Sequence, residues 1–190
     1  MSESLVVAAP LGVEACALRL GAPGIRVLRT GAGRRRARRA AKVIAGDPAT
    51  RVAIAGVCGA LDSELELGDV VVVSELIDPD GAKRETETDA LVEALEALGV
   101  RTRVGALVSQ DHLVHGEERA RLRETGAIAV DMESAWLAQG AGERPLATLR
   151  VVVDGPDREL LRPGLVRDGW RALKVLRRAA PALERWAQTS

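Results

Sequence analysis

The chain has 190 residues, of which 47% are hydrophobic and 28% are charged, and this balance predicts one globular domain over residues 1–190 with a sizeable buried core. Its 27 basic and 27 acidic side chains cancel, which argues against nucleic acid or an anionic membrane as a partner. With two cysteines, no apolar run near the roughly 20 residues that span a bilayer and no basic segment of a signal peptide, the sequence predicts a cytoplasmic protein without an integral membrane segment.

Short runs rich in β-branched residues alternate with helical patterns along the chain. Seven runs predict strands: Leu5–Ala9, Ile25–Leu28, Arg51–Val57, Asp69–Leu76, Val104–Ser109, Ala127–Asp131 and Leu146–Asp154. Several of them, such as the VVVV run at 70–73, are apolar on both faces. Such strands are typical of a sheet that is covered on both sides.

Helical periodicity is clearest in three segments. Apolar residues recur at spacings of three and four in 37–44, 91–98 and 166–180. Pro181 follows the third stripe, and a proline there is expected to kink the last helix or to start a new one. Because strands alternate with helices, we expect an α/β fold, a three-layer αβα single domain with a mixed, largely parallel central sheet. The polar, turn-rich segment Asp78–Glu87 is expected to form a mobile loop.

Glycines and carboxylates gather where the predicted strands end. The first three strands are followed by PLGVE (10–14), TGAG (30–33) and GVCG (56–59). Later strands end in SQDH (109–112), DME (131–133) and DGPD (154–157). Because open α/β sheets bind ligands at the carboxyl ends of their strands, these endings predict a shared pocket.

Five longer motifs run in a fixed order between residue 5 and about residue 157. They are TGAGRRRARRA (30–40), IAGVCGALDSELELGDVVV (54–72), LVSQDHLV (107–114), AVDMESAWLA (129–138) and RVVVDGPD (150–157). Together they resemble the nucleoside phosphorylase and nucleosidase superfamily, which includes purine nucleoside phosphorylase and methylthioadenosine/S-adenosylhomocysteine nucleosidase and cleaves N-glycosidic bonds. The tail DGPDRELLRP (154–163) is similar, more narrowly, to the hopanoid-associated branch, which removes adenine from adenosylhopane.

The resemblance implies that Asp154, Glu14 and Arg150 are the catalytic residues. In the family the aspartate matching Asp154 assists departure of the base at N7, and burial at a strand end would favour its acid form. The glutamate matching Glu14 orients or deprotonates water in the nucleosidase branches, and Arg150 would help to hold water or phosphate. From the residues alone, Asp154 could instead form a turn, Glu14 could complement a helix dipole and Arg150 could be a solvated strand residue.

Glu133 and Met132 match the ribose motif. A carboxylate can accept hydrogen bonds from two adjacent hydroxyls, which fits a ribose cis-diol. The family uses the glutamate for the 2′- and 3′-hydroxyls and packs the methionine on the sugar face. From the residues alone, Glu133 could merely cap the following helix. Asp131 receives no role, since backbone donors could satisfy it.

The resemblance also implies a set of residues around the base: Ser109, Asp111, His112, Leu113, Val57, Cys58 and Gly59. Leu113 stands where several members carry an aromatic residue, so base recognition is expected to rest on backbone groups and His112. Ile54 and Val57 stand where the phosphorylases carry an arginine and the nucleosidases a hydroxyl. These departures predict a more apolar pocket, which would suit a hydrophobic 5′ substituent on the nucleoside.

Gly31 and Gly33 precede Arg34 at the start of a helical pattern and could cradle a phosphate at a helix N-terminus. The third glycine of a dinucleotide fingerprint is missing, because position 36 is Arg. A Rossmann cofactor is therefore not expected.

No metal site is expected either. Asp111, His112 and His115 lack clear further ligands. The sequence therefore predicts no cofactor other than phosphate as a co-substrate.

The expected activity is cleavage of the N-glycosidic bond of a purine nucleoside, adenosine-type, by attack of water or phosphate on C1′. The expected partner is a small-molecule nucleoside, and the family implies a homodimer or hexamer. The alternative is a non-catalytic nucleoside-binding or sensor protein of the same fold, which the altered nucleophile positions would allow.

Overall fold

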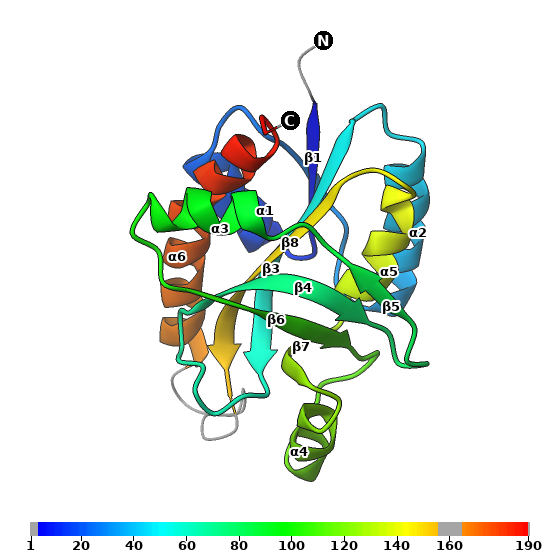
Figure 1. Cartoon of the computed structure of the whole chain (residues 1–190), viewed down its shortest axis with the longest axis vertical. Coiled ribbons are helices and arrows are strands. Elements are labelled where there is room, and N and C mark those ends of the chain that lie inside the picture. Colours follow the sequence, from blue (N-terminus) through cyan, green and yellow to red (C-terminus); the bar gives the residue numbers. More distant parts are fainter. Residues whose placement is uncertain (1–3, 156–164, 190) are drawn as a thin grey trace.

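The computed structural model describes residues 4–155 and 165–189. Its strands are β1 (Leu5–Ala9), β2 (Arg26–Arg29), β3 (Arg51–Ala60), β4 (Val70–Ile77), β5 (Lys83–Glu85), β6 (Thr102–Ser109), β7 (Ala127–Asp131) and β8 (Leu146–Asp154). They form one sheet in the order β2-β1-β3-β7-β6-β4-β5, and β8 pairs with both β3 and β4. Figure 1 shows this sheet running through the middle of the molecule.

The sheet is mixed and largely parallel. Strand β1 pairs in parallel with β2 and β3, β8 with β3, and β6 with β4 and β7. The antiparallel pairs are β3 with β7, β4 with β5 and β4 with β8. The pairings of β3, β8, β4, β6 and β7 therefore close into a ring. Within it, Gly59 of β3 is the register partner of both Asp154 in β8 and Val130 in β7.

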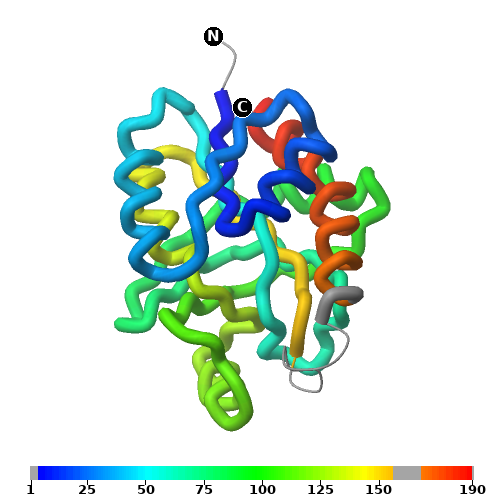
Figure 2. The backbone as a smooth tube through the Cα atoms, turned by 180° about the vertical axis from the view of Figure 1, so that it is seen from behind, coloured from blue at the N-terminus to red at the C-terminus, as the bar shows by residue number. Residues whose placement is uncertain are grey.

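Helices cover both faces of the sheet. They are α1 (Gly12–Gly21), α2 (Arg34–Ala45), α3 (Asp89–Glu96), α4 (Glu117–Arg123), α5 (Ser134–Ala138), the 3-10 helix η1 (Gln139–Ala141) and α6 (Leu165–Trp186). Helices α1 and α3 pack against α6 on one face, and α2 packs against α5 and η1 on the other (Figures 1 and 2). Helix α4 contacts β7 and projects from the lower end of the molecule in Figure 1.

Strand β3 explains why the central strands are apolar on both faces. Ala53 and Ala55 pack into the core under α1 and α6, whereas Val52 and Ile54 pack into the core under α2 and α5. Successive strand residues point to opposite faces, so a strand between two helical layers needs apolar residues at every position.

The fold class predicted from the sequence is confirmed, and three details differ. Strand β3 extends to Ala60, so the segment 56–59 lies inside the strand and not in a turn after it, because Gly59 continues the pairing with β7 and β8. The expected loop Asp78–Glu87 contains β5, which pairs with β4. Helix α6 runs through Pro181 as one helix, so Pro181 does not start a new helix.

Two further predictions concern the rest of the chain. Most of the tail at 154–163 lies outside the described residues, so its narrower resemblance stays a prediction. In the described part of the chain, no helix is long and apolar enough to cross a bilayer.

Candidate active site

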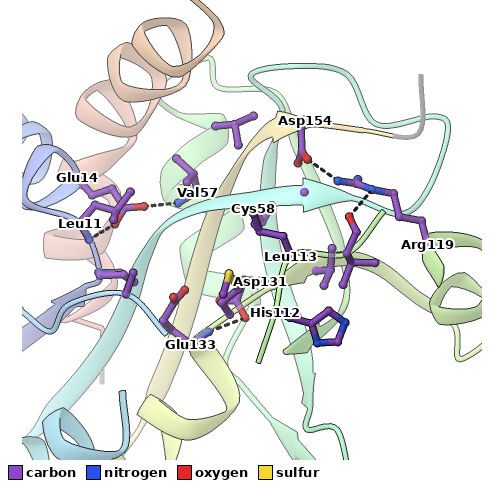
Figure 3. Close-up of a pocket in the computed structure, with 17 residues that line it drawn as sticks. Leu11, Glu14, Val57, Cys58, His112, Leu113, Arg119, Asp131, Glu133 and Asp154 are labelled. Carbon is purple, nitrogen blue, oxygen red and sulfur yellow. Dashed lines mark hydrogen bonds and ion pairs between the residues drawn. The ribbon is translucent and has the colours of Figure 1, made fainter. Parts of the chain in front are cut away.

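A cavity of about 280 Å³ opens where β1, β3, β7 and β8 end (Figure 3). Its lining residues are Pro10, Leu11, Glu14, Ala32, Val57, Cys58, Gly59, His112, Leu113, Val114, Arg119, Val130, Asp131, Met132, Glu133, Val153 and Asp154. The lining includes Glu14, Glu133 and Asp154, which are far apart in the sequence. The fold therefore brings the predicted strand endings together in one pocket.

Glu14 lies in the first turn of α1 and is 1% exposed. One carboxylate oxygen accepts a hydrogen bond from the backbone N–H of Leu11 at 2.6 Å, and the other accepts one from Val57 at 2.8 Å. Burial raises the pKa of Glu14, and the nearby Arg150 opposes that rise. The result is a carboxylate fixed in position and more basic than a solvated one.

Gly56 lets Glu14 and Arg150 approach each other. A Cβ at position 56 would lie 2.4 Å from Nη1 of Arg150 and 2.6 Å from Oε1 of Glu14. Any other residue would therefore force one of the two charged side chains to move. Nη1 of Arg150 has no hydrogen-bond partner among the residues that the structure describes. A small polar molecule between this N–H group and Glu14 would satisfy it.

Arg150 is wholly buried, so it is not a solvated strand residue. Its guanidinium pairs with Asp131 at 2.5 Å and donates to Oγ of Ser134 at 2.7 Å. It lies behind the cavity lining and not in it. Its Nη1, unpartnered within the described residues, lies over Gly56 beside Glu14, so the expectation that Arg150 helps to hold the nucleophile stays a prediction.

Asp131, which the sequence left without a role, organises the turn that carries the ribose motif. It accepts hydrogen bonds from Oγ of Ser109 at 2.6 Å and from the backbone N–H groups of Glu133 and Ser134. Ser109 is itself fully buried and does not line the cavity. The prediction that Ser109 contacts the base is therefore wrong, since its hydroxyl is used to hold the turn.

Glu133 is 7% exposed and lines the cavity beside Met132. It does not cap α5 with its side chain; its Oε1 accepts a hydrogen bond from the backbone N–H of Gly33 at 2.7 Å. Burial, and then the charge of Asp131, raise the pKa of Glu133 to about 7. An acceptor of this kind suits a ligand that brings its own hydroxyl donors.

Asp154 closes the other end of the cavity and is paired with an arginine that the sequence did not reveal. Arg119 of α4 forms an ion pair with Asp154, and both side chains are buried. Arg119 also donates to the carbonyl oxygens of Ala60 at 2.7 Å and Val114 at 3.2 Å. The sequence-based expectation considered the burial of Asp154 alone and did not include this charged partner.

The remaining predicted residues around the base divide between the lining and the surface. Val57, Cys58 and Gly59 line the cavity from β3, and His112 and Leu113 line it from the segment before α4. Burial raises the pKa of the Cys58 thiol, so Cys58 is an apolar wall. Asp111 does not line the cavity; it is exposed and bonds to its neighbour His112 and to Arg34.

The predicted phosphate residues do not meet the catalytic ones. Gly33 and Arg34 line a separate surface hollow with Arg35, Arg36, Arg39 and Asp111, and Gly31 lines neither cavity. Arg34 pairs with Asp111 at 3.3 Å and lies 5.6 Å from the ring centroid of Trp136. Only Gly33 reaches the main cavity, through its bond to Glu133.

Within residues 4–155 and 165–189, no group of three or more His, Cys, Asp or Glu side chains is arranged to hold a metal ion. The absence of a cofactor stays a prediction.

Comparison with known protein families gives a match over most of the chain. The family model described as the phosphorylase superfamily matches residues 7–186. No curated protein matches the chain by sequence.

Solved structures share its fold. A 5′-methylthioadenosine/S-adenosylhomocysteine nucleosidase of Campylobacter jejuni superposes with a TM-score of 0.84 at 17% identity, covering 98% of this chain and 100% of its own. The futalosine hydrolase of Helicobacter pylori gives 0.78 at 18% identity, covering 98% and 97%. An S-adenosylhomocysteine nucleosidase from Streptococcus pyogenes in complex with 5-methylthiotubericidin gives 0.77 at 18% identity, covering 94% and 96%.

Proposed function

The chain belongs to the phosphorylase superfamily, and we propose that it is a nucleosidase that hydrolyses the N-glycosidic bond of a purine nucleoside. The observation that carries the proposal is that Glu14, Glu133 and Asp154 line one cavity. Asp131, a fourth buried carboxylate of the lining, already pairs with Arg150, and the other three are costly unless each has a partner or a task. The nucleosidases of similar fold support the choice of reaction.

Each carboxylate has a separate task in this reaction. Glu133, with Met132 beside it, binds the two ribose hydroxyls, and Asp154 contacts the purine base of the substrate; all three residues line the cavity. Glu14 binds a water molecule and takes its proton while the water oxygen bonds to C1′. The C1′–N9 bond breaks, its electron pair goes to the base, and the base then takes up one proton. The products are a free base and a free pentose.

Water is favoured over phosphate as the nucleophile. The buried Glu14 has a raised pKa, which suits a general base that deprotonates water. Phosphate would need free cations in the cavity near C1′. Arg34 lines a separate hollow, Arg150 lies behind the lining, and Arg119, which does line the cavity, is paired with Asp154.

The walls of the cavity support an adenosine-type substrate with an apolar 5′ substituent. Val57, Val130 and Val153 line it, and Leu11 and Leu113 are exposed where it opens. Apolar walls of this kind gain free energy from covering an apolar group and offer little to a charged one. The hopanoid link, the homodimer or hexamer and the cytoplasmic location stay predictions.

A base-release screen tests the proposal. Adenosine, 5′-methylthioadenosine and a 5′-alkyl adenosine are incubated with the protein, with and without phosphate, and free adenine is measured by chromatography. We expect release without phosphate, fastest for a substrate with an apolar 5′ group. Release only in the presence of phosphate would contradict hydrolysis. Binding without release from any of them would favour the non-catalytic sensor.

The pKa of Glu133 gives a pH dependence with a defined sign. Below pH 7 its carboxyl is largely protonated, and above pH 7 it is a carboxylate that accepts two hydroxyl donors. We therefore expect kcat/KM for adenosine to rise with pH through an inflection near 7. The charges of Asp131, Glu14 and Arg150 also act on the carboxyl of Glu133. The inflection therefore reports the titration of these interacting groups together.

Glu133→Gln is the variant that assigns this inflection. It should abolish the inflection near 7 and lower kcat/KM for adenosine about tenfold or more, since hydrogen bonds to a charged group contribute roughly 1.5–3 kcal/mol. The control substrate is 2′-deoxyadenosine, which lacks one of the two hydroxyls. The variant should therefore lower kcat/KM less for this substrate than for adenosine. Equal losses on both substrates, or an inflection that persists in the variant, would remove Glu133 from the ribose role.

A further inference from the structure

Arg119 is a buried cation in the cavity that the proposed reaction does not yet use. It is the one buried residue of α4, 4% exposed, and it lines the cavity opposite the end that holds Glu133 (Figure 3). A buried guanidinium is costly unless its N–H groups are satisfied. Arg119 pairs with Asp154, so under the proposed function it lies beside the base of a bound nucleoside.

The backbone of β3 is shaped to admit this ion pair. A Cβ at Gly59 would lie 2.6 Å from Oδ1 of Asp154 and 3.3 Å from both Nη1 and Nη2 of Arg119. The pair therefore packs against bare backbone, and a side chain at position 59 would displace it. Gly59 is itself part of the lining. The pair thus belongs to the wall of the cavity and not to the protein interior behind it.

We propose that Arg119 stabilises the negative charge of the departing base, and that Asp154 is the carboxylate that holds Arg119 in position and binds the base beside it. The proposal rests on the proposed function and deepens it. It changes the task of Asp154 from proton donor to acceptor. A fixed cation at the site where charge develops is one of the strongest ways to lower a barrier in a water-poor cavity.

The electron and proton balance agrees with this assignment. When the C1′–N9 bond breaks, both of its electrons go to the purine, which leaves as an anion. A guanidinium has five N–H donors and does not give up a proton in a protein. Nε donates to Val114, Nη1 to Ala60 and Nη2 to Asp154. Nη1 and Nη2 each carry a second N–H group. In this proposal these groups donate to the departing base, which later takes its proton from water.

A purely structural role for Arg119 is the competing explanation. Its bonds to Val114 and Ala60 could simply anchor α4 to the sheet. An anchor and a charge-stabilising group differ in one respect: an anchor affects all substrates alike. A charge-stabilising group matters only when the base leaves with a negative charge.

The experiment compares adenosine with 7-methyladenosine, whose base already carries a positive charge and leaves neutral. The variants are Arg119→Gln, Arg119→Lys, which keeps a cation, and Arg121→Gln, an exposed arginine on the same helix as the matched control. We expect Arg119→Gln to lower kcat/KM for adenosine about 100-fold or more, the size of effect measured for single oxyanion-stabilising donors. On 7-methyladenosine the same variant should equal or exceed the wild type, and Arg119→Lys should lie in between on adenosine.

Two controls keep the outcomes separate. Thermal unfolding is measured for every variant, and the double variant Arg119→Gln/Asp154→Asn removes both charges, so that neither is left buried alone. If the wild type leaves 7-methyladenosine intact, nicotinamide riboside replaces it, because its cationic pyridinium base also leaves as a neutral molecule. Equal losses on both substrates by a folded variant would overturn the role of Arg119. A wild type that releases no base from any nucleoside would instead overturn the proposed function.

Discussion

Glu14→Gln is expected to lower the rate of hydrolysis about 1000-fold, in the middle of the 10²–10⁴-fold range of general base catalysis. Glutamine has nearly the same shape, but only one of its two terminal atoms accepts hydrogen bonds. The carboxylate of Glu14 accepts one bond from Leu11 and one from Val57. The amide must therefore turn its NH₂ group toward one of these N–H donors, and it cannot take a proton from water.

The matched control for this variant is Asp69→Asn. Asp69 is also a buried carboxylate that accepts a backbone N–H, that of Glu66 at 2.9 Å, but it does not line the cavity. We expect Asp69→Asn to affect stability and to leave kcat nearly unchanged. Single-turnover base release, with and without phosphate, measures the effect. If Glu14→Gln lowers the rate of base release no more than Asp69→Asn does, then Glu14 does not act on water.

Asp154→Asn should lower kcat for base release about 100-fold and weaken adenine binding far less. The amide cannot hold the guanidinium of Arg119 as a carboxylate does, so the cation beside the base loses its fixed position. Both partners are buried, and the asparagine leaves the charge of Arg119 without its carboxylate. We expect a loss of about 3–5 kcal/mol in the free energy of unfolding, the usual result of breaking a buried pair from one side.

Asp154→Asn/Arg119→Gln separates these two effects. The double variant removes both charges, so its free energy of unfolding should recover most of the loss, whereas its activity on adenosine should not. Denaturant unfolding and adenine release give the two measurements. Equal losses in the rate and in adenine binding by Asp154→Asn would remove Asp154 from the reaction.

The residues that meet in the cavity could be predicted from the sequence, because each of them follows or ends a strand. Glu14 follows β1 and Asp154 ends β8, both parallel to β3, and Glu133 follows β7, which pairs antiparallel with the end of β3. Their motifs fixed which residue of each segment to choose. The strand patterns were equally informative, since the strands between the two helical layers must be apolar on both faces.

Arg119 could not be found in the same way. It lies in EERARLR (117–123), where it is one of three arginines in a charged segment that resembles a solvated helix face. Only the tertiary structure brings it to Asp154, 35 positions later in the chain. The role of Asp131 was hidden for a similar reason, because its partners Ser109 and Arg150 come from two other strands. Long-range pairing of buried charges leaves no periodic trace in a single sequence.

The remaining errors come from hydrogen bonds that turn a side chain away from the cavity. Ser109 stands at a strand end, as a base-binding residue would, but its hydroxyl is committed to Asp131. Asp111 is drawn to the surface by Arg34 and His112. Ser109 ends β6 and Asp111 follows it, and in each case a hydrogen-bond partner decided the direction of the side chain.

The ring formed by β3, β8, β4, β6 and β7 leaves β2 and β5 at the two ends of the strand order. These outermost strands are the sequences RVLR (26–29) and KRE (83–85), which are short and rich in charge. A strand of another chain pairs poorly with edge strands of this kind, because the pairing would bury charged side chains. The layout that gathers the buried carboxylates thus also protects the protein against edge-to-edge aggregation at high concentration.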